Sequence, residues 1–186
     1  MTTIYIDGYN TILRCSPFKE LCPVDLEGAR DMFIDRMARF GASVRERVVI
    51  VFDGKNEHGG LPGTVNDKHL DVVFTTDEPS ADVYIQRALT RGGGRTEHIV
   101  VTGDNALAGA ASARGAIAIS PEMFMRHVAH AERETARAAD TPGRKPHHVR
   151  IEDLISSESQ SHLLAIKAER SARTSRAQRT EDPSQP

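Results

Sequence analysis

Apolar residues in the first 120 positions fall into short runs that are separated by longer amphipathic stretches. The runs are Ile4–Ile6, Val48–Phe52, Val72–Phe74, Ile99–Val101 and the weaker Ala116–Ile119. Their apolar character is continuous, whereas a half-exposed strand would alternate between apolar and polar residues. Continuous runs are typical of strands that are buried on both faces of a parallel sheet. The pattern therefore predicts five strands in one buried, mostly parallel sheet.

Helical spacing fills the intervals between these runs. Apolar residues recur about every 3.6 positions over Leu26–Phe40 and, more loosely, over Val83–Leu89, while Ala106–Ala113 is rich in alanine, the best helix former. Ser120 and Pro121 are typical of a helix start, as N-cap and first helical residue. The resulting order, β-α-β-β-α-β-α-β-α, predicts an open, doubly wound α/β sheet.

The chain changes character after about residue 130. We expect residues 1–130 to form the α/β domain, 131–166 to form a linker with a short helical extension, and 167–186 to be a disordered basic tail. Arginines recur every three residues in this tail and include Arg170 and Arg173. A tethered cationic arm of this kind would favour encounter with RNA phosphates.

Composition narrows the class of protein. The 186 residues carry a net charge of -2, so the chain lacks the overall basic character that is usual for a nucleic-acid-binding domain. Cys15 and Cys22 lack metal-ligand spacing and are interpreted as reduced thiols. The sequence shows neither a signal-peptide pattern nor an apolar run of about 20 residues that would span a membrane. We therefore expect a cytoplasmic protein without a membrane partner.

Acidic residues follow the predicted strands at corresponding positions. Asp7 follows the first strand in IDGYNTI, Asp53 follows the second in VVIVFDG, and Asp104 follows the fourth in VVTGDN. Asp82 lies in the first turns of the helix after the third strand. Each of them alone is also typical of a turn or a helix cap. Because the carboxyl ends of parallel strands meet at one edge, we expect the four carboxylates to lie together there.

Carboxylates that lie close together repel one another unless a cation intervenes. Mg²⁺ or Mn²⁺ is the expected cofactor, because hard divalent ions prefer carboxylate and water oxygens. Asn10 follows Asp7 closely and can orient a carboxylate or a bound water molecule. The pattern therefore predicts a divalent-metal site at the carboxyl edge of the sheet.

The segments IDGYNTI, VVIVFDG, ADVYIQRAL, VVTGDNAL and RGAIAISPEMF resemble, in this order, the YacP-like branch of the NYN-domain proteins. That family belongs to the PIN-like nuclease superfamily, and the resemblance covers roughly residues 2–126. It implies the strand order 3-2-1-4-5 and metal-dependent endoribonuclease activity on RNA. In some relatives the substrate is ribosome-associated mRNA, which makes mRNA and the ribosome expected partners. Transferred to this chain, the family's acidic site comprises Asp7, Asp53, Asp82 and Asp104, with Asn10 in support.

Metal-assisted hydrolysis of a phosphodiester assigns a role to each of these residues. Asp7 and Asp104 are expected to be the principal metal ligands, and Asp82 to be a ligand or to position a water molecule. Asp53 is expected to lie outside the direct ligands. Other residues are candidates for substrate binding because they lie beside the first strand, flank the Gly-rich loop 54–69 or belong to the tail: Tyr9, Lys55, Lys68, His69, Arg170 and Arg173.

One departure from the family pattern keeps a second class of function open. Many relatives carry an acidic residue two positions before the Ala-Asp pair, where this chain has Pro79; Asp77 and Glu78 are its acidic neighbours. The alternative is therefore a catalytically silent RNA- or protein-binding module with the same fold. A phosphatase of the haloacid dehalogenase type is disfavoured, because Tyr9 stands where its second aspartate would be needed.

Overall fold

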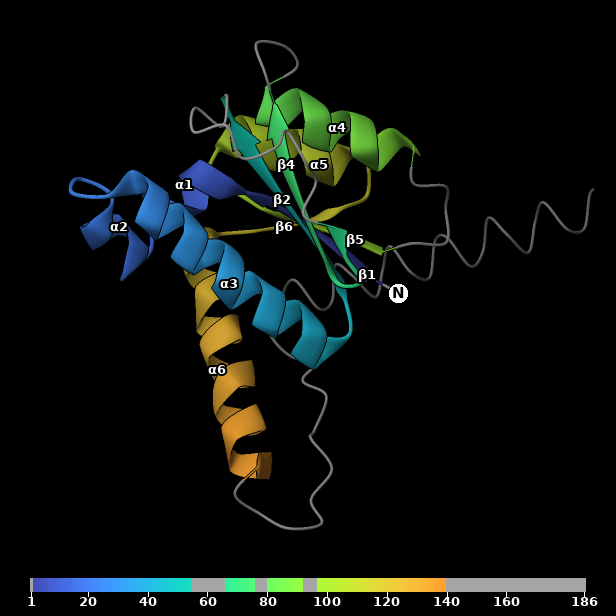
Figure 1. The fold of residues 1–186 in the computed structure, drawn as a ribbon. Helices are drawn as coiled ribbons and strands as arrows, with labels where there is room; N and C mark the ends of the chain where they lie inside the picture. The colour runs from blue at the N-terminus through green and yellow to red at the C-terminus, as the bar shows by residue number, and fades with distance from the viewer. Residues whose placement is uncertain (1, 55–65, 76–79, 92–96, 140–186) are drawn as a thin grey trace, which may run out of the picture. The chain divides into compact units, whose positions relative to one another are not determined.

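The computed structural model describes residues 2–54, 66–75, 80–91 and 97–139 (Figure 1). The chain divides into two units, Met1–Val149 and Arg150–Pro186, and all of the described residues belong to the first. No helix in the described ranges combines the length and the apolar character that are needed to cross a membrane.

The centre of the first unit is a sheet with the strand order β3-β4-β2-β1-β5-β6. Five of its strands are parallel and lie in the order β4-β2-β1-β5-β6. Counted along the chain without the antiparallel β3, this is the predicted order 3-2-1-4-5. The sixth, β3, has two residues and pairs antiparallel with β4 at the edge of the sheet. It was not predicted, because two residues are too short for a periodic pattern. The bounds are β1 Thr2–Asp7, β2 Arg47–Asp53, β3 Asn66–Asp67, β4 Leu70–Thr75, β5 Glu97–Val101 and β6 Ile117–Ile119.

Helices cover both faces of the sheet (Figure 1). The four predicted helices are present, and two lie on each face: α4 (Ala81–Arg91) and α5 (Asn105–Ala113) on one, α3 (Leu26–Val44) and α6 (Pro121–Ala139) on the other. Two short helices, α1 (Gly8–Ile12) and α2 (Phe18–Leu21), follow β1 and were not predicted because each is little more than one turn. Helix α6 continues through residue 130, and the predicted domain boundaries stay a prediction.

The continuous apolar run of β2 is explained by this two-sided cover. Val49 and Val51 belong to a buried cluster with the apolar residues of α4 and α5. Val48 points to the opposite face, where it approaches Gly41 of α3. Every residue from Val48 to Phe52 is at most 4% exposed, so neither face of the strand tolerates a polar side chain. The buried sheet thereby provides a rigid base for the residues at its carboxyl edge.

Candidate active site

Asp7 is the last residue of β1 and the N-cap of α1. Its Oδ1 accepts a hydrogen bond from the Asn10 backbone N–H at 3.3 Å, and its Oδ2 accepts one from the Thr102 hydroxyl at 3.3 Å. The helix-cap role and the site role therefore do not exclude each other. Capping α1 holds the carboxylate at the carboxyl edge of the sheet, where a ligand of an α/β protein would bind.

The turn from β1 into α1 depends on a close contact with β2. A Cβ atom at Gly8 would lie 2.4 Å from the Phe52 ring, so only glycine allows this approach. Tyr9 packs edge-on against the same ring, with 4.9 Å between the ring centroids. The observed contact of Tyr9 is therefore one of packing, and its role in base stacking stays a prediction.

Two side chains connect this turn to the loop after β5. The Asn10 side-chain oxygen accepts a hydrogen bond from the Gly103 N–H at 2.8 Å. The Thr102 hydroxyl, which donates to Asp7, also accepts from the Asp104 N–H at 3.1 Å. Thr102 is only 4% exposed. Its buried hydroxyl therefore links the Asp7 carboxylate to the backbone of Asp104, the other predicted metal ligand. The sequence analysis missed Thr102, although a hydroxyl residue at the polar end of a buried strand was a usable signal.

Asp104 is the N-cap of α5, as the helix-cap interpretation of this residue required. Its Oδ1 accepts hydrogen bonds from the N–H groups of Ala106 and Leu107, at 2.6 and 2.9 Å. Its Oδ2 forms no hydrogen bond with any other residue in the described ranges. One oxygen thus orients the carboxylate, while the other is directed by the same cap and can accept a ligand.

Asp53 and Asp82 form the second half of the site. The Asp53 Oδ1 accepts from the Ala81 N–H at 2.5 Å and from the Thr75 hydroxyl at 3.0 Å, which joins the start of α4 to the ends of β2 and β4. Asp53 therefore positions the residue that follows Ala81. That residue is Asp82, which is half-buried and whose carboxylate forms no hydrogen bond with another described residue.

The four carboxylates interact electrostatically. The pKa of Asp7 is raised to about 6, chiefly by burial and also by the negative charges of Asp82 and Asp53, against the opposing hydrogen bonds of Asn10 and Thr102. Burial also raises the pKa of Asp82, with added repulsion from Asp104 and Asp53. We call this group, Asp7, Asp53, Asp82 and Asp104, the acidic edge.

A divalent cation suits the chemistry of the acidic edge. Its donors are hard carboxylate oxygens, which Mg²⁺ and Mn²⁺ prefer, and a cation would relieve their mutual repulsion. Within the described ranges, no three side chains of His, Cys, Asp or Glu form a group that could hold a metal ion. Mg²⁺ usually keeps several water molecules and contacts only one or two carboxylates directly. The arrangement therefore fits an ion that some of these carboxylates would contact through water.

Not all of the predicted substrate-binding residues lie near the acidic edge. Lys68 and His69 directly precede β4, and the His69 carbonyl accepts from the N–H of Val48 at the start of β2. They are therefore at the amino edge of the sheet, separated from the carboxyl edge by a six-residue strand of about 20 Å. They lie at the end of the loop 54–69, as the sequence indicated, but at the edge opposite to the acidic edge, and their role in substrate binding stays a prediction. Several residues lie outside the described ranges: Lys55, Asp77, Glu78, Pro79, Arg170 and Arg173.

Arg14 is a cation at the site that the sequence analysis did not single out. Its Nη2 donates to the Gly103 carbonyl at 3.4 Å, and its Nε lies 2.5 Å from where a Cβ of Gly103 would stand. The absence of a side chain at Gly103 thus allows the guanidinium group to lie across the loop between Thr102 and Asp104. Arg14 is exposed and forms no ion pair with a described carboxylate. No motif marked it, because its position depends on a contact 89 residues away.

Comparison with known proteins assigns the family. The profile of the YacP-like NYN domain matches residues 4–168, which is most of the chain. The chain belongs to this family. The match extends well beyond residue 126, where the motifs quoted from the sequence end. The uncharacterized protein YacP of Bacillus subtilis (strain 168) is 30% identical over 138 residues, which cover 74% of this chain and 81% of the relative.

Solved structures support the same assignment. The crystal structure of Rae1 (YacP) from Bacillus subtilis matches with a TM-score of 0.65 and 26% identity, over 98% of this chain and 97% of that chain. A tryptophan-to-leucine mutant of Rae1 matches with a TM-score of 0.62 and 25% identity, over 90% and 99%. The YacP-like NYN domain of this chain therefore has the PIN-like nuclease fold, and its class, at a coarse level, is that of a nuclease-type hydrolase.

Proposed function

We propose that this protein is a divalent-metal-dependent endoribonuclease that hydrolyses RNA phosphodiesters at the acidic edge. The observation that carries the proposal is the burial of two carboxylates, Asp7 and Asp82, beside other carboxylates that repel them. The pKa values of Asp7 and Asp82 are raised by burial and by other carboxylates, and neither residue forms an ion pair with a described Lys or Arg. A protein that retains such a group of charges gains from binding cations there.

The residues of the acidic edge would share the work of holding the ion. Asp7 and Asp104 would be ligands, and Asp82, whose carboxylate has no hydrogen bond to a described residue, would be a ligand or would orient the attacking water molecule. When bound, Mg²⁺ or Mn²⁺ supplies Lewis-acid stabilisation of the phosphoryl oxygens and lowers the pKa of a bound water molecule. Asp53 would position Asp82 through the start of α4, and Asn10 and Thr102 would hold the loop after β5.

RNA is the substrate that the family assignment favours. Arg14 would contact a phosphate group next to the scissile bond, because its guanidinium lies on the loop that carries Asp104 and has no described acidic partner. An arginine can donate two parallel hydrogen bonds to a phosphate, which orients as well as binds it. We propose mRNA, including mRNA on the ribosome, as the physiological target and the cytoplasm as the place of action.

Cleavage of labelled RNA by Asp82→Asn tests the proposal. Wild-type protein should cleave single-stranded RNA with Mn²⁺ or Mg²⁺ and lose this activity in a chelator. Asp82→Asn should reduce the rate by at least about 100-fold, because a metal site contributes several kcal/mol to transition-state stabilisation. Asp35→Asn, an exposed change on α3 with the same loss of charge, should cleave like wild type.

The same assay separates the nuclease from the catalytically silent binding module. Wild-type protein that retains RNA in a chelator but cleaves no RNA with either metal would be such a module. Activity that survives in Asp82→Asn, with its metal dependence unchanged, would refute the assignment of the acidic edge as the catalytic site.

A further inference from the structure

Helix α6 carries equal numbers of arginines and glutamates in the sequence, and its arginines lie along one exposed face. Its residues Pro121–Ala139 include three arginines and three glutamates, so its formal charge is zero. Four residues are exposed at helical positions i, i+4, i+7 and i+11, which places them along one face. We call this group the basic stripe: Arg126, His130, Arg133 and Arg137.

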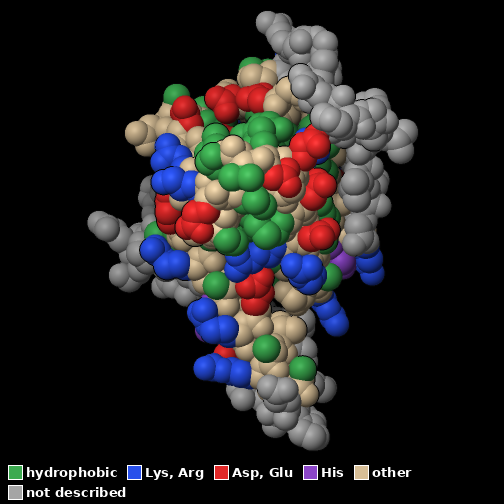
Figure 2. All heavy atoms as spheres, turned by 60° about the vertical axis from the view of Figure 1, so that its left-hand side comes forward, with side chains coloured by type: hydrophobic (Ala, Val, Ile, Leu, Met, Phe, Trp, Pro, Cys, Tyr) green, Lys and Arg blue, Asp and Glu red, His purple; other side chains and the backbone are tan. Residues whose placement is uncertain are grey.

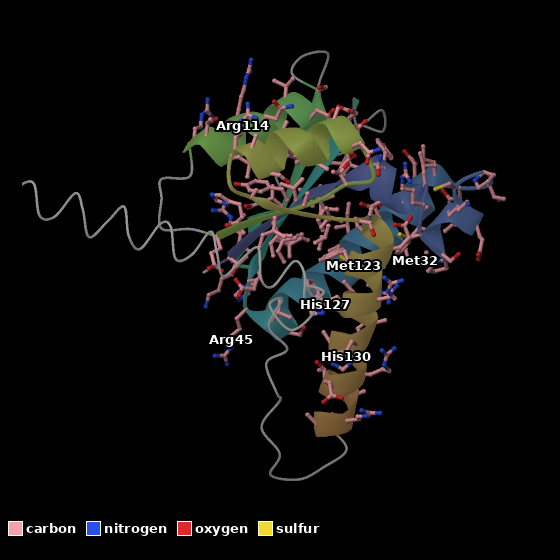
Figure 3. The ribbon with its side chains drawn as sticks, turned by 180° about the vertical axis from the view of Figure 1, so that it is seen from behind. Met32, Arg45, Arg114, Met123, His127 and His130 are labelled. Carbon is pink, nitrogen blue, oxygen red and sulfur yellow. The ribbon has the colours of Figure 1, made fainter. Side chains whose placement is uncertain are left out.

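The opposite face of α6 is buried against the rest of the protein. Phe124, Val128 and Ala131 are at most 4% exposed and form the buried face of α6, which includes an edge-on contact between the rings of Phe124 and Phe40 of α3. The basic stripe lies on the side away from these residues. Figure 3 labels one of its members, His130, on this helix, farther from the sheet than the buried His127.

Two of the three glutamates are neutralised by ion pairs. Glu132 accepts two hydrogen bonds from the Arg36 guanidinium of α3, both at 2.8 Å. Glu134 accepts from Arg137 at 2.8 Å, within the same helix. Arg126 and Arg133, by contrast, form no ion pair with another residue in the described ranges. The basic stripe therefore keeps the positive charge of these two arginines for an outside partner.

The position of α6 relates the basic stripe to the acidic edge. Strand β6 ends at the carboxyl edge of the sheet and leads directly into α6, whose far end extends away from the sheet (Figure 1). From Arg126 to Arg137 the helix rises about 16 Å, at 1.5 Å per residue. Figure 2 shows the corresponding contrast on the surface: acidic side chains gather in its upper half, and mainly Lys and Arg lie in the lower half, where α6 extends.

We propose that the basic stripe binds the phosphate backbone of the RNA strand whose scissile bond lies at the acidic edge. The inference rests on the proposed function and adds to it a second contact region for the same strand. A site built of carboxylates repels phosphate groups, so the binding energy for a long strand has to come from cations placed outside it. Arginines on an exposed helix face, with the phosphates of one strand along them, provide that energy without sequence preference.

A double variant, Arg126→Gln/Arg133→Gln, tests this in the full-length protein. The probe is a fluorescently labelled, single-stranded RNA of 20 nucleotides, and its binding is measured by anisotropy in a chelator at 50 to 200 mM salt. Each phosphate contact on a single strand contributes about 0.7 to the slope of log affinity against log salt. We expect the slope to fall by about 1.4, so that the fourfold rise in salt weakens wild type about sevenfold more than the variant.

The matched control is Arg87→Gln/Arg114→Gln, which removes the same charge from exposed positions on the opposite face of the sheet. Arg114 lies at the end of α5 and is labelled in Figure 3. The slope of log RNA affinity against log salt should be the same for this control variant as for wild type. Thermal melting should show that both double variants are folded. A slope that is unchanged in the Arg126/Arg133 variant would overturn the inference. An equal fall in the control would do so too, because it would reveal only the effect of net charge.

Two further measurements identify the partner and separate the two proposals. If the Arg126/Arg133 variant loses binding of labelled poly-glutamate but not of RNA, the basic stripe serves an acidic protein and the inference is wrong. Cleavage with Mn²⁺ is measured separately, on an RNA of four nucleotides that reaches only the acidic edge; the double variant should cleave it like wild type. If wild-type protein cleaves no RNA while the slope still falls as expected in the Arg126/Arg133 variant, the nuclease proposal is refuted and the basic stripe remains an RNA site.

Discussion

Replacement of Asp7 by asparagine should stabilise the metal-free protein at neutral pH, although Asp7 is a helix-capping residue. Burial raises the pKa of Asp7 from 3.8 to about 6, and the charges of Asp82 and Asp53 contribute to the rise. This rise in the pKa of Asp7 means that the ionised carboxylate lowers the free energy of unfolding by about 3 kcal/mol. Asparagine caps a helix about as well as aspartate does, so the bond from the Asn10 N–H can be kept. The expected gain for Asp7→Asn is therefore up to about 3 kcal/mol.

The direction of the pKa shift determines how this gain depends on pH. Above about pH 6 the carboxyl group is ionised in both the folded and the unfolded protein, and the folded state bears the full cost of burying the charge. Below about pH 4 the group is protonated in both states, and the cost disappears. The stability advantage of Asp7→Asn should therefore develop between about pH 4 and pH 6 and stay constant above.

Urea unfolding in a chelator at pH 4, 5, 6 and 7 measures this difference. Asp25→Asn is the control, because Asp25 also caps a helix, with its Oδ1 accepting from the Gly28 N–H at 2.7 Å, but is exposed and lies outside the acidic edge. Saturating Mg²⁺ or Mn²⁺ should stabilise wild type by mass action and leave Asp7→Asn unchanged. An advantage that is absent at pH 7, or equally large at pH 4, would contradict the electrostatic argument.

Three other predictions test individual contacts of the site. Thr102→Val should lower the free energy of unfolding by about 1 kcal/mol in a denaturant titration, because it leaves the part-buried Asp104 N–H without its acceptor and the Asp7 carboxylate without a donor. Thr102→Ser should restore most of this loss. Gly8→Ala should destabilise by about 1–3 kcal/mol through its clash with an aromatic ring, whereas Gly109→Ala, which meets nothing within 4 Å, should stabilise by up to about 1 kcal/mol; thermal melting of both compares them. Arg14→Gln should raise KM for RNA about tenfold with little change in kcat, and equal kinetics of Arg14→Gln and Arg114→Gln would show that Arg14 contacts no substrate.

The sequence by itself determined the sheet and the grouping of the carboxylates. A strand that is covered on both faces requires apolar residues at every position, and this requirement is visible in VVIVF without knowledge of its neighbours. The parallel order then places the ends of β1, β2 and β5 at one edge, so the positions of Asp7, Asp53 and Asp104 follow from local patterns and one topological rule. Asp82 follows in the same way from the helix start after β4.

Only the tertiary structure decided which other residues belong to the site. Thr102 and Arg14 take their roles from hydrogen bonds to partners far away in the sequence, and such contacts leave no periodic signal. Lys68 and His69 lie at the amino edge of the sheet, away from the site. This could not be predicted, because the sequence does not show at which edge of the sheet a loop ends. The formal charge of α6 is zero in the sequence, and only the structure shows that Glu132 is paired with an arginine of α3 while Arg126 and Arg133 stay exposed without a described acidic partner. The hydrophobic pattern of a strand or helix reflects burial along that one element, so the sequence shows it. The positions of these residues depend on contacts between different elements, which the sequence does not show.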